Sequence, residues 1–86
     1  MTIRFSKNFT RSYDKLSGKL KLQTNRRIKL FIQDRSLPQL HDHALVGEYT
    51  GYRSINITGD IRALYYQDGD EIVIFAFIGT HSQLYK

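Results

Sequence analysis

The sequence contains no cysteine and no tryptophan, and proline occurs only once. Without cysteine the chain has neither disulfide bonds nor thiolate ligands, which excludes the small proteins that depend on disulfides or cysteine-bound zinc. The core must therefore form from isoleucine, leucine, valine, phenylalanine and tyrosine side chains. Because 86 residues suffice for one such core, we expect a single domain over residues 1–86.

Long apolar runs and phosphate-binding glycine motifs are also missing. No stretch of about 18 apolar residues is present, as a membrane-spanning helix would need, and the first residues do not form a secretory signal. We therefore expect a cytoplasmic protein with no membrane partner. No Gly-x-Gly-x-x-Gly, Walker-type or Gly-x-Ser-x-Gly motif occurs, so the sequence predicts no nucleotide cofactor.

Acidic residues are scarce in the first part of the chain. Residues 1–36 hold ten of the thirteen lysines and arginines, which gives this segment a charge of +8, whereas the rest of the chain sums to −3. Clustered positive charge attracts polyanions such as RNA, although a solvated helix face is the alternative interpretation. Arg26 and Arg27, adjacent within this segment, are expected substrate-binding residues.

The pattern of polar and apolar residues predicts one strand and two helices in the first half. Alternation predicts a strand from Thr2 to Ser6, and the Ser6 hydroxyl can cap a following helix. Helical spacing of apolar residues predicts helices over Lys7–Ser17 and Lys19–Asp34. Gly18 between them suits the left-handed conformation that ends a helix, so we expect a basic helical hairpin.

Three predicted strands follow an irregular segment, residues 36–50. They are Tyr52–Ile57, Ile61–Gln67 and Glu71–Ile78, and Asp68-Gly69 is typical of a hairpin turn. The last strand is apolar from Ile72 to Ile78, so both its faces must be covered and it should be central. We expect an α+β fold in which the first strand and an antiparallel three-stranded meander form a four-stranded sheet, with the helical hairpin on one face.

Two of the three histidines, His41 and His43, flank Asp42 in the irregular segment. We expect the side chains of His41 and His43 to point to opposite sides of the segment, and no thiolate is available to complete a metal site. Residues 41–43 therefore do not predict a bound metal ion.

Histidine, arginine, aspartate and tyrosine near the predicted strand ends suit cleavage of RNA without a metal ion. In this reaction the 2′-hydroxyl of RNA attacks the neighbouring phosphate, so the protein supplies only a base, an acid and a cation. Histidine has a pKa suited to the first two tasks, and arginine offers phosphate oxygens a rigid pair of N–H donors. We expect the sheet face opposite the helices to bring together Arg53, Arg62, His81 and residues 41–43.

Each candidate also has a purely structural interpretation. His81 can be an exposed residue beyond the last strand, and Arg62 can form an ion pair with Asp60. Tyr85 can stack on a base or anchor the C-terminus, and Arg53 can be a phosphate ligand or ordinary surface charge.

Motifs in the second half of the chain resemble the RelE/ParE toxin superfamily, and its YafQ branch most closely. They are His43-Ala44-Leu45-Val46-Gly47, Gly51-Tyr52-Arg53, Gly59-Asp60-Ile61-Arg62-Ala63-Leu64-Tyr65 and Phe77-Ile78-Gly79-Thr80-His81-Ser82-Gln83-Leu84-Tyr85. The closing Gly-Thr-His-x-x-Leu-Tyr is the most distinctive, and the order of elements is similar over the whole chain. The resemblance implies a type II toxin that cleaves messenger RNA in the ribosomal decoding site until an antitoxin neutralises it.

The resemblance also implies roles for particular residues. His81 is similar to the YafQ-type catalytic histidine, as general acid, and His43 to the histidine of the loop before the second strand. Asp60 matches a carboxylate that orients or activates a histidine, and Arg62 an arginine that stabilises the transition state. The expected substrate-binding residues are Arg53, Tyr85, His41, Arg26 and Arg27.

Two positions depart from the YafQ pattern. Asn56 stands where these toxins tend to have a further histidine, and Phe77 where they tend to have an arginine. Asparagine cannot act as an acid or base, so His43, Asp60 and His81 would have to divide the proton transfers among themselves.

Three functions remain open at this point. The first is an endoribonuclease that acts on messenger RNA and the ribosome and forms a hetero-oligomer with a partly disordered cognate antitoxin. The second is a binding protein of the same fold, either a ParE-like inhibitor of DNA gyrase or an inactive member that only binds its antitoxin. The third, a plain RNA-binding domain, lacks an aromatic recognition motif of the RRM kind.

Overall fold

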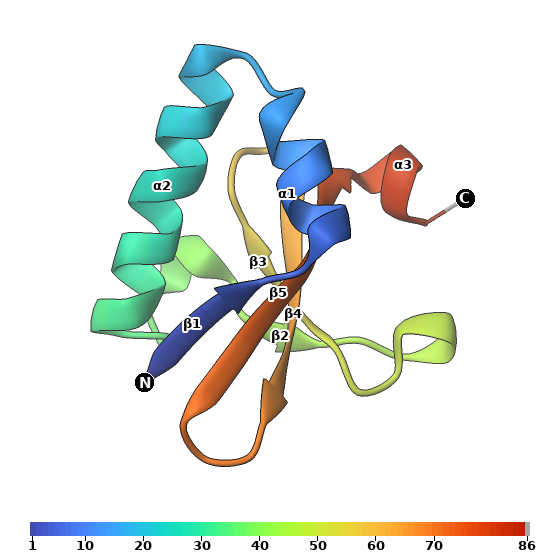
Figure 1. Cartoon of the computed structure of the whole chain (residues 1–86). Helices are drawn as coiled ribbons and strands as arrows, with labels where there is room; N and C mark the ends of the chain where they lie inside the picture. The colour runs from blue at the N-terminus through green and yellow to red at the C-terminus, as the bar shows by residue number, and fades with distance from the viewer. Residues whose placement is uncertain (86) are drawn as a thin grey trace.

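The computed structural model describes residues 1–85 and contains one mixed sheet with two helices on one face. Figure 1 shows α1 and α2 against one side of the sheet and α3 at the end of β5. Among these residues no helix has the length and apolar character needed to cross a membrane. The elements are β1 (Thr2–Phe5), α1 (Lys7–Asp14), α2 (Gly18–Gln33), β2 (His43–Ala44), β3 (Arg53–Asn56), β4 (Ile61–Asp68), β5 (Ile72–Thr80) and α3 (His81–Leu84), with 3-10 turns at Pro38–Leu40 and Gly47–Tyr49.

The α+β class and the helical hairpin are confirmed, but the sheet differs from the predicted four-stranded antiparallel one. It has five strands in the order β1-β5-β4-β3-β2, and β1 runs parallel to β5. Short turns force the meander strands β3, β4 and β5 to be antiparallel, whereas β1 connects to the meander only through the helices and a loop and is free to run parallel. The fifth strand, β2, comes from the segment expected to be irregular.

The boundary between the two helices also differs from the prediction. Ser6 caps α1 as expected, its Oγ accepting from the Phe9 backbone N–H at 3.0 Å. Gly18, however, does not end α1, because it is the first residue of α2. Ser17 caps α2 by accepting from the Leu20 backbone N–H at 3.2 Å, and a serine cap one residue earlier makes a left-handed glycine unnecessary.

Strand β5 is central and covered on both faces, as its continuous apolar sequence predicts. On the helix side Phe75 packs against Phe31 of α2 and Tyr65 of β4, with ring centroids 5.4 Å away in each case. On the opposite side Phe77 packs against Tyr49 and Tyr52, each at 5.8 Å. Aromatic rings therefore pack on both faces of the strand, and none of its residues is fully exposed to solvent.

A β-bulge in β5 decides which side chains reach each face. Leu64 pairs with Phe77 and Tyr65 pairs with Phe75, so Ala76 is the extra residue. The bulge breaks the strict alternation and directs Phe77 to the face opposite the helices. The Ser6 hydroxyl donates to the Ala76 carbonyl at 2.7 Å, so the cap of α1 also binds the bulge.

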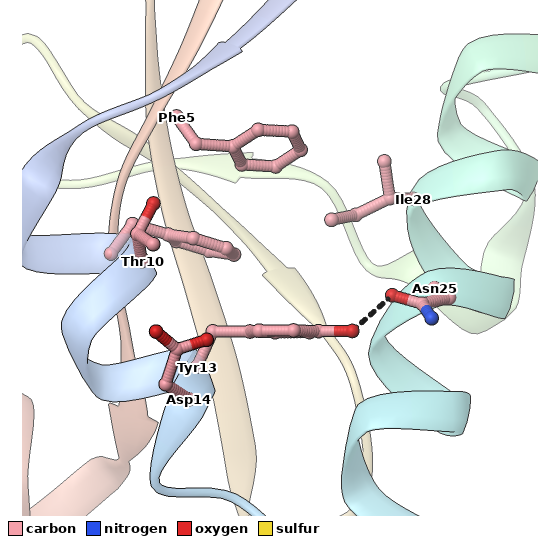
Figure 2. A pocket seen from close by; sticks show the side chains of 7 residues that line it. Phe5, Thr10, Tyr13, Asp14, Asn25 and Ile28 are labelled. Carbon is pink, nitrogen blue, oxygen red and sulfur yellow. Dashed lines mark hydrogen bonds between the residues drawn. The ribbon is translucent and has the colours of Figure 1, made fainter.

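The two helices are joined by a hydrogen bond over a partly open apolar hollow. Tyr13 Oη donates to Asn25 Oδ1 at 2.8 Å, and Figure 2 shows this bond below Phe5 and Ile28. These side chains and Phe9 line a hollow of about 330 Å³ between β1, α1 and α2. The basic hairpin thus has an apolar inner side.

Replacing Ser6 with alanine should destabilise the protein by about 1–2 kcal/mol, because both a helix cap and a bond to the bulge are lost. Urea unfolding monitored by circular dichroism measures this. Ser12→Ala on the same helix is the control, since within residues 1–85 its hydroxyl makes no hydrogen bond with the protein. Equal stabilities for the two variants would contradict the assignment.

Candidate functional site

The sheet register places His43, Ser54, Asn56 and Arg62 on the face opposite α1 and α2, hereafter the far face. His43 is opposite Ser54, and Asn56 is opposite Arg62. Paired residues on neighbouring strands point to the same side, and residues two apart on one strand do likewise. Since Ile55 between Ser54 and Asn56 is fully buried in the core below the helices, its two neighbours face the other way. The far face thus combines histidine, serine, asparagine and arginine.

His43 is held in a geometry that suits a general base. Its Nδ1 lies 2.8 Å from the backbone oxygen of His41. A carbonyl oxygen can only accept, so Nδ1 carries the proton of the neutral ring and Nε2 retains its lone pair. His43 can therefore accept a proton at Nε2 from a ligand on the far face.

The expectation that His41 and His43 point to opposite sides is wrong. His41 has a left-handed backbone with φ of 46°, and the two rings are 4.6 Å apart. Alternation in an extended chain separates adjacent side chains, so residues i and i+2 lie on the same side, and the left-handed His41 does not prevent the two rings from meeting. His41 is exposed beside His43 at the edge of the far face. Within the described residues, no three histidine, cysteine, aspartate or glutamate side chains group as metal ligands.

His81 begins α3 directly after β5, in a position that its neighbours define. Thr80 caps this one-turn helix, with Oγ1 accepting from the Gln83 N–H at 3.1 Å and its own N–H donating to Gln83 Oε1 at 2.8 Å. A Cβ on Gly79 would lie 2.9 Å from that Oε1, so a larger residue there would push the Gln83 side chain out of this cap. The Gly-Thr-His motif therefore builds a compact turn that presents an exposed His81, with its ring 4.7 Å from that of Tyr85.

Tyr85 lies over the far face beside Ser54 and Arg62. Burial and the neighbouring Tyr49 raise the pKa of Tyr85, and Ser54 and Arg62 oppose this shift weakly. The geometry between Tyr85 and Ser54 falls short of a hydrogen bond, since Ser54 Oγ has no partner.

Tyr49 donates from Oη to the Leu84 carbonyl at 2.8 Å and packs edge-on against Tyr85. Tyr49 thereby fixes the end of α3, a role that sequence reasoning missed although its Tyr-x-x-Tyr spacing with Tyr52 is a visible signal.

Arg62 is anchored by backbone carbonyls and not by an ion pair with Asp60, which was its structural interpretation. Its Nη1 donates to the carbonyls of Thr58 at 3.0 Å and Gly59 at 3.1 Å in the turn before β4. Within residues 1–85 no ion pair joins Arg62 to Asp60, whose side chain is exposed at this turn. Nε and Nη2 of Arg62 make no hydrogen bond in the described part of the chain and remain available to a phosphate.

Arg53 does not join the far face, which corrects the prediction that it converges with Arg62 and His81. It is opposite Tyr65, whose side chain packs under the helices, so Arg53 points to the helix side. There its Nε binds Asp42 Oδ1 at 2.8 Å, and this bond raises the pKa of Arg53. Its position one residue before Ser54 makes the two side chains diverge.

Asp42 is the centre of a buried polar cluster that sequence reasoning missed. Its side chain is only 7% exposed and also accepts from Arg35 Nε at 3.3 Å and Tyr65 Oη at 2.5 Å. Arg35 completes the cluster by donating to Tyr65 Oη at 2.7 Å. Burial and the bond to Asp42 raise the pKa of Tyr65, which stays a neutral donor. The cluster holds residues 41–43 against the end of α2 and so positions His43.

Arg26 and Arg27 lie on α2 and therefore on the side of the sheet opposite His43. Arg26 is exposed, whereas Arg27 Nη1 donates to the Gln39 carbonyl at 2.6 Å and holds the turn after α2. The structure therefore brings His43, Arg62, His81, His41 and Tyr85 to one side of the sheet and leaves Arg26, Arg27 and Arg53 on the other.

Asp42→Asn should destabilise the protein by about 2 kcal/mol, because two arginines lose their counterion. This is less than the roughly 3–5 kcal/mol typical of a fully buried pair, because both arginines are partly exposed. Denaturant titration measures the change. Asp68→Asn, at an exposed carboxylate, provides the matched control and should change stability by less than about 0.5 kcal/mol. A similar small change for Asp42→Asn would contradict the structural role of the cluster.

A family model described as bacterial toxin of type II toxin-antitoxin system, YafQ, matches residues 1–86. The Putative toxin YafQ of Haemophilus influenzae is 44% identical over 45 residues, which cover 49% of this chain and 44% of that protein, less than half its length.

Solved structures agree with the family model. YafQ from Escherichia coli strain BL21(DE3) has a TM-score of 0.77 and 26% identity, over 98% of this chain and 97% of that one. A chain of the E. coli DinJ–YafQ complex covers the same fractions, with a TM-score of 0.68 and 23% identity. The resemblance carried by the second-half motifs is confirmed: the chain belongs to the YafQ family of bacterial toxins of type II toxin-antitoxin systems.

Proposed function

We propose that the chain is an endoribonuclease that cleaves messenger RNA in the ribosomal decoding site without a metal ion. The observation that carries the proposal is that His43, with a free Nε2, and Arg62, with free N–H donors, lie on one sheet face beside the exposed His81. A base, a cation and an acid are the groups that attack by a 2′-hydroxyl requires.

The proposed reaction moves two protons. Nε2 of His43 takes the proton of the 2′-hydroxyl as its oxygen bonds to the adjacent phosphorus. Arg62 donates hydrogen bonds to the phosphate oxygens, whose negative charge grows in the transition state. The bond from phosphorus to the 5′-oxygen then breaks, and protonated His81 gives that oxygen its proton. The products are a 2′,3′-cyclic phosphate and a 5′-hydroxyl.

Asp60 and Tyr85 have supporting roles in this proposal. The exposed Asp60 carboxylate, at the turn that anchors Arg62, makes no side-chain hydrogen bond within residues 1–85 and is free to orient a histidine once RNA is bound. Tyr85, in ring contact with His81, can stack on a base beside the cleaved bond, and His41 borders the same face.

The ribosome and an antitoxin are the proposed partners. A site with few catalytic groups benefits when ribosomal RNA positions the substrate. The basic α2, on the other side of the sheet, would face ribosomal phosphates while the far face meets the messenger. YafQ of E. coli forms a complex with DinJ, which supports a hetero-oligomer of this chain with its own antitoxin.

His81→Ala should lower messenger RNA cleavage about 100-fold or more, the scale expected for loss of a general acid. Primer extension on messenger RNA incubated with translating ribosomes and purified protein measures this. Ser82→Ala, at the next exposed residue of α3, is the control and should cleave like the unmodified chain. Equal cleavage by the His81 variant would exclude His81 as the acid.

Replacing Lys19, Arg26 and Lys29 together with glutamine should weaken ribosome binding and reduce its dependence on salt, because fewer phosphate contacts release fewer counterions. All three side chains are exposed on α2. Sedimentation with ribosomes over a range of salt concentrations measures both effects. The matched control replaces Arg4, Lys7 and Arg11, which are equally exposed outside α2. If both triple variants lose the same affinity, net charge and not the α2 face determines binding.

A member that binds its antitoxin without cleaving RNA is the second candidate, because Asn56 cannot transfer a proton. Absence of cuts with the unmodified chain in the primer-extension assay would favour it. DNA gyrase assays would then test the ParE-like alternative.

A further inference from the structure

Two polar atoms on the far face are buried and have no hydrogen-bond partner. They are Ser54 Oγ and Asn56 Oδ1. Ser54 is 1% exposed, and it lies on β3 between β4 and the edge strand β2, opposite His43. Leaving such an atom unpaired destabilises a protein by about 1–3 kcal/mol, so native interiors contain few of them, and a bound ligand or water is a common partner. Ser54 and Asn56 are neighbours on the same strand face, so two such groups lie side by side.

These two atoms lie next to the groups that we propose carry out the reaction. Ser54 is paired across the sheet with His43, the proposed base, and Asn56 is paired with Arg62, the proposed cation. Residues two apart on a strand are about 6.7 Å apart, the scale of one step between nucleotides in an extended RNA strand. A serine hydroxyl donates and accepts, and an amide oxygen accepts, so both can bind hydroxyl groups.

Tyr85 at present occupies the space above Ser54. Its phenol lies close enough to Ser54 and Arg62 for both to affect its pKa. Tyr85 follows the last residue of α3 and belongs to no strand, so a rotation of its side chain would leave the hydrogen bonds of the sheet intact. The phenol oxygen therefore occupies a position that a hydroxyl of RNA can take when Tyr85 turns to stack on a base.

We propose that Ser54 Oγ and Asn56 Oδ1 bind the 2′-hydroxyls of two consecutive ribonucleotides at the cleaved bond. Ser54, opposite His43, binds the 2′-oxygen that attacks, and Asn56, opposite Arg62, binds the 2′-hydroxyl of the next nucleotide. The pair makes the site specific for RNA over DNA. This inference rests on the proposed function and adds to it the two groups that position the sugars.

The inference predicts opposite effects on stability and on RNA recognition. Ser54→Ala removes an unpaired buried hydroxyl and should raise Tm by about 4–8 °C. Ser6→Ala, the same substitution at a hydroxyl with two partners, should lower it. Ser54→Thr keeps the hydroxyl and should retain recognition of the sugar. A serine that serves only the fold would instead lower Tm when replaced by alanine.

The deciding experiment measures binding to ribosomes that carry messenger RNA with a single 2′-deoxynucleotide, moved position by position along the decoding-site codon. All variants also carry His81→Ala, so that bound RNA stays intact. With Ser54 and Asn56 present, two adjacent deoxy positions should each weaken binding about fivefold. Ser54→Ala should abolish the effect at the first position and Asn56→Ala at the second, whereas Asn8→Ala, at an exposed asparagine of α1, should abolish neither.

The outcomes separate this inference from the proposed function. If both deoxy effects persist in the Ser54 and Asn56 variants, or if no deoxy position weakens binding, the inference is wrong even where primer extension shows cleavage. If each variant abolishes its own effect, the inference holds even where the unmodified chain fails to cleave, and only the catalytic proposal is then lost.

Discussion

Burial of β5 on both faces is the constraint on which the rest of the structure depends. Phe75 on one side requires the layer formed by α1 and α2, and Phe77 on the other requires the tyrosines of the loop before β3. β1 pairs with one edge of β5 and β4 with the other, and the end of β5 carries α3 and His81. The bulge at Ala76 serves both demands, because it turns Phe77 to the far face while Phe75 stays in the core. The apolar strand thus supports the candidate site at its end.

The second organising interaction is the buried carboxylate of Asp42. It binds Arg35 beyond α2 and Arg53 on β3, and thereby holds the loop that carries His43. A charge with so little exposure persists only because two arginines and Tyr65 surround it. His43 owes its position to this cluster and its free Nε2 to the His41 carbonyl. The functional loop is therefore fixed by polar contacts, in contrast to the apolar support of His81.

Much of the fold and part of the site followed from local sequence. The serine cap at Ser6, the helical hairpin and the central apolar strand depend on neighbours in the chain, and so does the Gly79-Thr80-His81 turn. Predictions failed where distant contacts decide. Arg53 was placed with Arg62, but it meets Asp42 on the other face. The structural alternative for Arg62, an ion pair with Asp60, is absent within the described residues, where the nearby carbonyls of Thr58 and Gly59 hold Arg62 instead. The unpaired Ser54 Oγ has no signature in sequence at all.

The sequence by itself determined the α+β class, the basic first half, the two-sided burial of the last strand and the family to which its closing motif points. These properties follow from composition, periodicity and short motifs, which act over a few residues. Only the tertiary structure decided the parallel pairing of β1, the addition of β2 and the face to which each polar side chain of β3 turns. A strand's alternation divides its side chains into two sets, but which set is buried depends on where helices from another part of the chain pack.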